Sequence, residues 1–236
     1  MLKIKNYRKS YGSKLAVDGI SLEVKPGEIF GFIGHNGAGK TTTIKGVVGI
    51  LEFDEGEILV NGNSITNDPI RCKMDMAYIP DSSEFYEVLT GISYINFIAD
   101  IYEVSKEKRE TLTRKYADIF ELTANLGDSI SSYSRGMKQK LAIIAALVHQ
   151  PKLLVLDEPF VGLDPKASHS LKMIMQEMCD NGGSIFFSTH VLEVAEKLCD
   201  QIAIIKEGKI VAMGKTEEVM GTKSLEEVFL GLTDHE

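Results

Sequence analysis

The sequence predicts an α/β fold: a mixed β-sheet core with N-terminal antiparallel strands and an inserted helical segment. Strand-like and helix-like hydrophobic patterns alternate before residue 84 and again from residue 151, which is typical of α/β proteins. Polar and apolar residues alternate over 14–33, as in short strands, whereas residues 84–150 show only helical periodicity. We therefore predict one domain, with a core from residues 1–83 and 151–236 and a helical subdomain between them.

Short strands are expected in residues 14–33 because this segment contains two turn signals, Asp18-Gly19 and Pro26-Gly27. The segment EIFGFIG (28–34) is an apolar strand that enters a glycine-rich loop. A helix should follow the loop, since apolar side chains recur at helical spacing: Ile44, Val47, Val48 and Leu51.

Two further strands and two amphipathic helices are expected next. The strands are EILVNG (57–62) and DMAYIP (75–80). The first helical stripe consists of Ile92, Ile95, Ala99 and Tyr102. The second consists of Leu112, Tyr116, Ile119 and Phe120. Both stripes have the spacing that places side chains on one face of a helix.

Strands and helices alternate again in the last third of the chain. LLVLDE is a buried strand, and Asp164-Pro165 should cap a helix with one apolar face. SIFFST is another strand, followed by a helix at 190–199 and by a hairpin around Glu207-Gly208. The last stretch, KSLEEVFLGLTDHE, reads as a short amphipathic helix whose packing partner the sequence leaves open.

The composition is typical of a soluble globular protein and limits the classes of function. Of the 236 residues, 44% are apolar and 25% charged. The net charge of -8 argues against non-specific nucleic-acid binding. Cys72, Cys179 and Cys199 show no CxxC spacing, so reduced thiols are expected. No signal-peptide pattern is visible, and the longest apolar run, LAIIAALV, is shorter than the roughly 20 residues of a membrane span.

Residues 34–41, GHNGAGKT, match the phosphate-binding P-loop and lie where it belongs, after a strand and before a helix. Its glycines let backbone N–H groups face phosphate oxygens at a helix N-terminus. Lys40 would contact the β- and γ-phosphates, and the Thr41 hydroxyl would bind Mg²⁺. The predicted ligand contacts here are Gly34, His35, Asn36, Gly37, Ala38, Gly39, Lys40, Thr41 and Thr42.

Asp157 and Glu158 follow four apolar strand residues. Ligands of open α/β sheets bind at the carboxyl ends of the strands. We expect Asp157 to hold Mg²⁺, directly or through water, and Glu158 to polarise the attacking water as general base. An acidic strand end can instead cap a neighbouring helix, but the P-loop upstream favours the catalytic interpretation.

His190 follows SIFFST, at the end of another predicted core strand. A lone histidine is more often structural or solvated than catalytic. Its position beside the phosphate site favours a catalytic role, in which it hydrogen-bonds the γ-phosphate and senses its loss.

The segment YSRGMKQK (133–140) opens an amphipathic helix for which Ser134 is a natural N-cap. An arginine and two lysines lie in its first turns, so the segment is either a well-capped helix or an anion-binding surface.

The order of the P-loop, YSRGMKQK, LLVLDEP, GLDP and STH resembles the ATP-binding subunits of ABC transporters, over essentially the whole chain from Tyr11 to Gly214. In that family YSRGMKQ corresponds to the signature motif, which presents a serine and a helix N-terminus to ATP bound by the opposing subunit. Ser134 and Gly136 match its consensus, whereas Tyr133, Arg135 and Met137 depart from it.

The resemblance implies roles for three more residues. Tyr11 resembles the aromatic residue that stacks on adenine, with an ordinary surface tyrosine as the alternative. Asp164, in GLD, resembles the D-loop that links the two sites of a dimer, and it can also act as an N-cap. Asp81 stands where the family usually has a glutamine that contacts Mg²⁺ and the attacking water. Being shorter and charged, it would reach the metal through water. The same loop, about 81–90, should lie near the groove for the membrane subunit.

The resemblance also implies an ATPase of the ABC type that binds ATP and Mg²⁺ and powers a membrane transporter. Its expected partners are an integral membrane subunit and a second ATP-binding subunit, identical or different, and it should lie at the cytoplasmic face of the membrane. No nucleic acid is expected as a partner. SRGMKQK, Glu-Pro-Phe and GLDP most resemble the ABC-2-type exporter branch.

Three alternatives are compatible with parts of the sequence. An ABC ATPase acting on DNA or the ribosome usually carries a long coiled-coil insertion or two nucleotide units, and neither is visible. A slowly hydrolysing regulatory subunit is suggested by Asp81 and Arg135 and opposed by the intact Lys40, Glu158 and His190. A parallel-sheet kinase would leave Ser134 and its setting unexplained.

Overall fold

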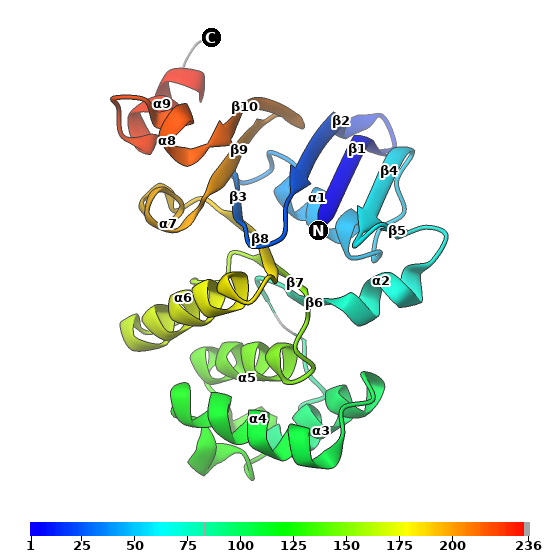
Figure 1. Cartoon of the computed structure of the whole chain (residues 1–236), viewed down its shortest axis with the longest axis vertical. Helices are drawn as coiled ribbons and strands as arrows, with labels where there is room; N and C mark the ends of the chain where they lie inside the picture. Colours follow the sequence, from blue (N-terminus) through cyan, green and yellow to red (C-terminus); the bar gives the residue numbers. More distant parts are fainter. Residues whose placement is uncertain (83, 234–236) are drawn as a thin grey trace.

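The computed structural model describes residues 1–82 and 84–233 and contains two β-sheets with helices packed around them (Figure 1). The N-terminal sheet is antiparallel, as the sequence predicts. Its strands, in spatial order, are β2 (Lys14–Val24), β1 (Leu2–Tyr11), β4 (Glu55–Val60) and β5 (Asn63–Ser64).

The second sheet is mixed and forms the centre of the molecule. Its strands, in spatial order, are β10 (Lys209–Lys215), β9 (Gln201–Lys206), β3 (Ile29–Ile33), β8 (Ser184–Thr189), β7 (Leu153–Asp157) and β6 (Met76–Ile79). All neighbours pair in parallel except β9 and β10, the predicted hairpin. Every residue of β3, β7 and β8 is buried, as expected where both faces of a parallel sheet are covered. Their carboxyl ends therefore meet at one edge.

The turn predicted at Asp18-Gly19 is wrong, because β2 continues through these residues. The register against β1 shifts opposite this point. Gly19 has a φ of 67°, and Asp18 accepts hydrogen bonds from the Arg8 guanidinium. Pairing with β1 thus turns the signal into a β-bulge. The second signal, Pro26-Gly27, does form a turn before β3.

Helices flank the sheets in the two core segments. They are α1 (Lys40–Val47), α2 (Pro69–Asp75), α6 (Pro165–Asp180), α7 (Leu192–Leu198), α8 (Thr216–Met220) and α9 (Leu225–Thr233). The short helices α2 and α8 escaped prediction. Helix α9 confirms the predicted C-terminal helix over its described part; residues 234–236 of that stretch, and Ser83 of the predicted loop 81–90, lie outside the described residues.

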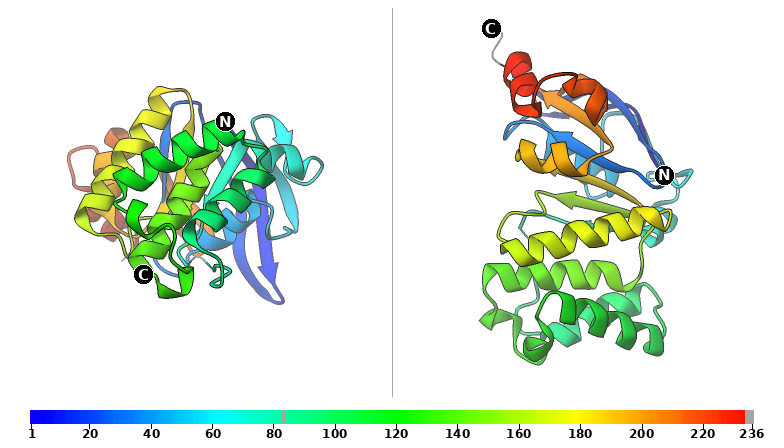
Figure 2. Two further views of the ribbon diagram at one scale, coloured as in Figure 1. Left: turned by 90° about the horizontal axis from the view of Figure 1, so that it is seen from below. Right: turned by 60° about the vertical axis from the view of Figure 1, so that its left-hand side comes forward.

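The segment predicted as helical contains α3 (Gly91–Ile101), α4 (Lys106–Ile119) and α5 (Arg135–Val148), with short 3₁₀ turns at Thr123–Asn125 and Ile130–Ser132. The predicted stripes face inward: Ile95, Ala99, Leu112, Tyr116 and Phe120 are buried. The three helices form one end of the molecule, and the sheets form the other (Figure 2).

Two hydrophobic clusters hold these layers together. One lies between the sheets, where Phe30 and Phe32 of β3 pack on Phe186 and Ile44 of α1 is completely buried. The other joins the central sheet to the helical segment and includes Ile79 of β6. Helix α1 and the C-terminal half of α5 therefore pack on the same sheet, from opposite sides.

Candidate active site

The glycine-rich loop between β3 and α1 is tightly packed on one side. A Cβ atom at Gly34 would lie 2.6 Å from the carbonyl oxygen of Ile205 in β9. A Cβ atom at Gly39 would lie 2.8 Å from the carbonyl oxygen of Ala16, and Gly39 has a φ of 112°. Both positions require glycine, because a side chain would collide with backbone of a neighbouring strand. The loop is therefore held close to β2 and β9 before it enters α1.

Lys40, the first residue of α1, is bound inside this loop. Its Nζ donates to the carbonyl oxygens of Gly34, at 2.6 Å, and His35, at 3.2 Å. It also lies 3.5 Å from Oε1 of Glu158. The side chain is only 6% exposed, so its positive charge is confined to the space enclosed by the loop.

Thr41 and Asp157 provide adjacent oxygen atoms of the kind that Mg²⁺ prefers. Thr41 Oγ1 donates to Asp157 Oδ2 at 2.8 Å, and Ser188 Oγ donates to Asp157 Oδ1. Within residues 1–82 and 84–233 there is no group of three or more His, Cys, Asp or Glu side chains placed to hold a metal ion. Mg²⁺ is commonly bound by one or two protein oxygens together with substrate phosphates and water, and this donor set fits that pattern.

Glu158 and His190 are in direct contact. His190 Nδ1 lies 2.9 Å from Glu158 Oε1, and the His190 backbone N–H donates to Glu158 Oε2 at 3.3 Å. Glu158 has a φ of 50°, a left-handed conformation that costs a residue with a Cβ atom about 1–2 kcal/mol. Its own N–H donates to the carbonyl oxygen of Ser188, at 3.2 Å, which holds this conformation in place.

Lys40, Thr41, Asp157 and Glu158 share an open cavity of about 580 Å³. Its lining residues are Tyr11, Lys14, Leu15, Ala16, Asn36, Gly37, Gly39, Lys40, Thr41, Thr42, Asp81, Asp157, Glu158 and Glu207. The structure thus brings together most of the residues predicted for the P-loop, the metal and the base. Tyr11 is 50% exposed at the rim, and Leu15 is 42% exposed.

Some predicted residues lie outside this lining, and some lining residues escaped prediction. Gly34 and Ala38 are packed away from the cavity, and His35 is exposed beside it. His190 contacts Glu158 but does not line the cavity. No sequence pattern points to Lys14 or Glu207, because they reach the cavity only through the pairing of distant strands.

The N-terminus of α5 forms a separate cluster with the segment after Glu158. Ser134 is the N-cap, as predicted: its exposed Oγ accepts from the N–H of Met137 at 3.2 Å. A Cβ atom at Gly136 would lie 3.1 Å from the carbonyl oxygen of Gly162. Gly136 is thus placed against the segment that carries Asp164, and both Ser134 and Gly136 lie outside the cavity of their own chain.

Asp164 ties the two segments together. Its Oδ1 accepts from the N–H of Ala167 at 2.8 Å, which confirms the predicted N-cap of α6. Its Oδ2 lies 2.7 Å from Nζ of Lys140 in α5. The contact with Lys140 holds the pKa of the Asp164 carboxyl below its ordinary value.

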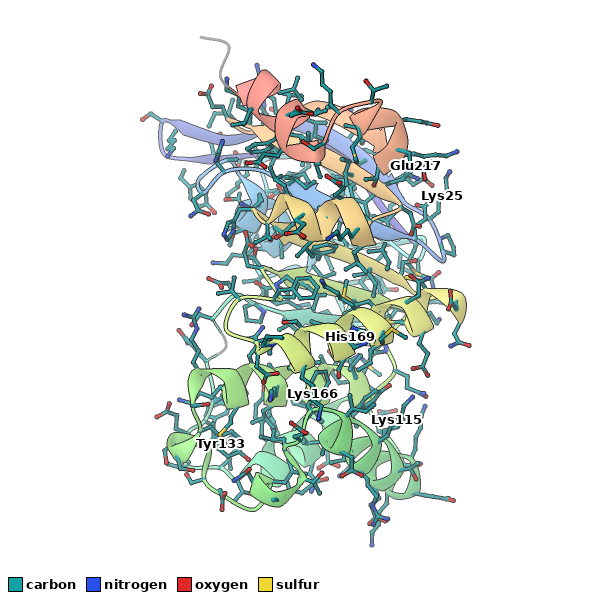
Figure 3. The ribbon with its side chains drawn as sticks, turned by 90° about the vertical axis from the view of Figure 1, so that its left-hand side faces the viewer. Lys25, Lys115, Tyr133, Lys166, His169 and Glu217 are labelled. Carbon is teal, nitrogen blue, oxygen red and sulfur yellow. The ribbon has the colours of Figure 1, made fainter. Side chains whose placement is uncertain are left out.

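Asp81 lies between the two regions. It lines the large cavity and also a smaller one of about 300 Å³ with Arg135. Its Oδ1 is 3.9 Å from the Arg135 guanidinium. Tyr133 lines the small cavity. It lies at the helical end of the molecule, whereas Glu217 of α8 lies at the opposite end (Figure 3). Asp81, which stands where the family usually has a glutamine, and Arg135, which departs from the signature consensus, therefore face each other.

The sequence profile of the family described as "ABC transporter" matches residues 17–161. The chain belongs to the ABC transporter family. Among curated relatives, the linearmycin resistance ATP-binding protein LnrL of Bacillus subtilis is 35% identical over 214 residues, covering 91% of this chain and 69% of that protein. The ABC-type transporter ATP-binding protein EcsA of the same organism is 34% identical, covering 99% and 96%.

A solved structure described as the ATP-binding subunit of an ABC transporter superimposes with a TM-score of 0.95 at 34% identity, covering 99% of both chains. The predicted fold class is confirmed, and the chain is an ATP-binding ABC ATPase subunit. Within the part of the chain that the structure describes, no helix has the length and apolar character needed to span a bilayer.

Proposed function

We propose that this ABC subunit hydrolyses ATP with Mg²⁺ in a site completed by a second subunit, and that it powers export through an integral membrane partner at the cytoplasmic face of the membrane. One observation carries the proposal. Lys40, Asp157 and Glu158 converge on one cavity and His190 contacts Glu158, whereas the capped, exposed Ser134 lies outside the cavity. Half of a site is thus assembled within the chain, and the complementary half is presented outward.

The triphosphate would exchange contacts with Lys40. In the described structure its Nζ bonds to two loop carbonyls, and the β- and γ-phosphates would take over these bonds, with the loop N–H groups around them. Tyr11 and the apolar Leu15 lie at the rim, where a base can stack. Thr41 and Asp157 would hold Mg²⁺, which neutralises charge on the phosphates.

Hydrolysis then requires a base beside the γ-phosphate. Water oxygen forms a bond to the γ-phosphorus, the bond from that phosphorus to the bridging oxygen of ADP breaks, and the Glu158 carboxylate accepts the water proton. His190 fixes the orientation of Glu158, since both its ring and its N–H contact the carboxylate. Asp81, at the cavity wall, would act on the metal through water.

The second subunit would supply Ser134 and the N-terminus of α5, because a helix N-terminus favours an anion. Gly136 against Gly162, and Lys140 against Asp164, would make the signature segment and the segment after Glu158 move together. We propose residues 84–150 as the subdomain that moves. Since the complete site binds ATP better than ADP, hydrolysis would open the dimer.

Export is supported by two features. The segments SRGMKQK and GLDP resemble those of ABC-2-type exporters. LnrL is described as a resistance protein, and removing a toxic compound from the cell is one route to resistance. The membrane partner would be identified as the integral protein that co-purifies with this chain.

The Glu158→Gln variant tests the proposal. It should bind ATP with Mg²⁺ as the wild type does, hydrolyse it about 100-fold or more slowly, and accumulate as an ATP-bound dimer in light scattering. Glu226→Gln, exposed on α9, is the matched control and should hydrolyse normally. If the wild type with its membrane partner hydrolyses ATP no faster than Glu158→Gln, the active-enzyme proposal is wrong.

A slowly hydrolysing regulatory subunit is the second candidate, because the Arg135 guanidinium draws Asp81 towards the helical segment. The same comparison decides between them. A wild-type rate near that of Glu158→Gln, with nucleotide binding intact, would favour the regulatory role.

A further inference from the structure

The C-terminal helix α9 lies against the glycine-rich loop. The ring centroids of His35 and Phe229 are 4.7 Å apart, with the rings inclined at 63°. This edge-to-face arrangement is a favourable geometry for two aromatic rings. Phe229 is only 5% exposed, whereas His35 is exposed. A buried side chain of α9 therefore supports an exposed part of the loop.

Helix α9 is itself anchored on the segment that follows His190. The N–H of Leu225, a completely buried residue, donates to Oε2 of Glu196 in α7 at 3.0 Å. Helix α7 begins at Leu192, two residues after His190. Figure 1 shows α9 beside α8, at the β9–β10 end of the central sheet. One short helix thus joins the segment after His190 to the phosphate-binding loop.

His35 is the point at which this contact can affect the site. Its carbonyl oxygen accepts from Lys40 Nζ at 3.2 Å, so a displacement of His35 displaces a partner of Lys40. Gly34 is already fixed by its close approach to Ile205. His35, Asn36 and Gly37 are exposed, and the ring of His35 is the side chain through which α9 restrains them.

We propose that Phe229 is a positioning residue for nucleotide binding, which acts through His35 to hold the phosphate-binding loop in its binding conformation. A loop that is already ordered loses less conformational freedom when the triphosphate binds, so affinity is higher. This proposal rests on the proposed ATP-binding function. It assigns to α9 a role that the sequence pattern of the loop alone does not require.

A double-mutant cycle on the affinity for a fluorescent ATP analogue with Mg²⁺ tests the proposal on the full chain. Phe229→Leu keeps most of the buried volume and removes the ring, and it should weaken binding about threefold to tenfold. His35→Ala should weaken binding similarly. The double variant should bind no more weakly than the weaker single variant, because both remove one contact. Phe229→Tyr keeps the ring and should restore affinity.

Glu226→Ala, on the exposed face of α9, is the control and should bind as the wild type does. Thermal unfolding of each variant separates a loss of folded protein, which lowers the number of sites, from a change in affinity. Additive effects of Phe229→Leu and His35→Ala, or an unchanged affinity of either variant, would overturn the role of α9 and leave the proposed function intact. A wild type that binds no nucleotide would overturn both. His35→Ala changes an exposed side chain, so it stays informative if Phe229 variants unfold.

Discussion

The cavity and the N-terminus of α5 differ in how much of their geometry a single chain fixes. In the cavity, Lys40 is 6% exposed and Glu158 12% exposed, and each has at least two partners. At α5, Arg135 is 70% exposed and its contact with Asp81 spans 3.9 Å. The contacts of the first region are fixed within its own chain, whereas the second region is open to solvent. If the proposed second subunit covers it, a site divided in this way would respond to assembly, because neither half would act alone.

The largest effect on ATP affinity is expected when the positive charge of Lys40 is removed from the cavity. Lys40→Ala should weaken ATP binding about 100-fold, because a charge-assisted contact to the phosphates is lost in a buried position. Isothermal titration with ATP and Mg²⁺ measures this. Lys138→Ala, near the start of α5, should leave the affinity of the separate subunit within about twofold. Equal losses of ATP affinity in Lys40→Ala and Lys138→Ala would contradict the expectation that the cavity, and not the start of α5, binds ATP in the separate subunit.

Protonation of His149, at the buried end of α5, should lower the free energy of unfolding by about 2–3 kcal/mol between pH 7 and 4. Burial lowers the pKa of His149 to about 4, and its ring stacks on Tyr102 with centroids 3.7 Å apart. The unfolded state therefore binds the proton more readily than the folded state. The stabilisation is present above the unfolded pKa of about 6.5 and is lost as the pH falls from there towards 4.

Chemical denaturation between pH 7 and 4 would measure this loss. His149→Gln can still donate to the carbonyl oxygen of Met76, which lies 3.2 Å from His149 Nε2, but cannot titrate. Its free energy of unfolding should therefore fall less over this range. An identical decrease in the two proteins would show that other groups cause the pH dependence.

The exposed cap should matter for hydrolysis more than for folding. Ser134→Ala should lower the ATPase rate of the assembled protein about tenfold and destabilise the chain by about 1 kcal/mol. Ser105→Ala removes the corresponding cap of α4, where Ser105 Oγ accepts from the N–H of Lys108. It should destabilise the chain similarly and leave the rate unchanged. A comparable loss of rate in both variants would assign Ser134 a purely structural role.

The smallest effect is expected for the contact between Asp81 and Arg135, which links the cavity to the N-terminus of α5. Because Asp81 and Arg135 are both half-exposed or more, their pairing contributes at most about 1 kcal/mol. Arg135→Ala should change the ATPase rate about twofold to threefold, and Asp81→Arg combined with Arg135→Asp should recover part of the stability lost in each single variant. An exchange that recovers nothing would show that the two charges are not coupled.

The sequence predicted most of the local structure around the site. The P-loop, the strand before Asp157 and the caps at Ser134 and Asp164 follow from short-range rules of spacing and capping, and the structure has them where predicted. The catalytic, nucleotide-binding and metal-binding roles stay predictions. Asp68 at the N-cap position of α2, followed by Pro69 at its first position, was a usable signal for a helix that was missed.

Long-range geometry escaped prediction for a physical reason. Strand pairing in β1 and β2 converts Asp18-Gly19 from a turn into a bulge, and local propensity cannot reveal which strand will be the partner. The same holds for Lys14 and Glu207 at the cavity, and for Phe229 against His35, since 194 residues separate the two rings.

Helix α5 is long enough for a small rotation at one end to move its other end by several ångströms. Its 14 residues span about 21 Å, with the stacked ring of His149 at one end and the serine hydroxyl at the other. A tilt of about 10° around the buried end would carry the tip through roughly 4 Å, more than the length of a hydrogen bond. Small rearrangements around His149 would therefore suffice to bring the Ser134 hydroxyl into contact with a ligand or to remove it.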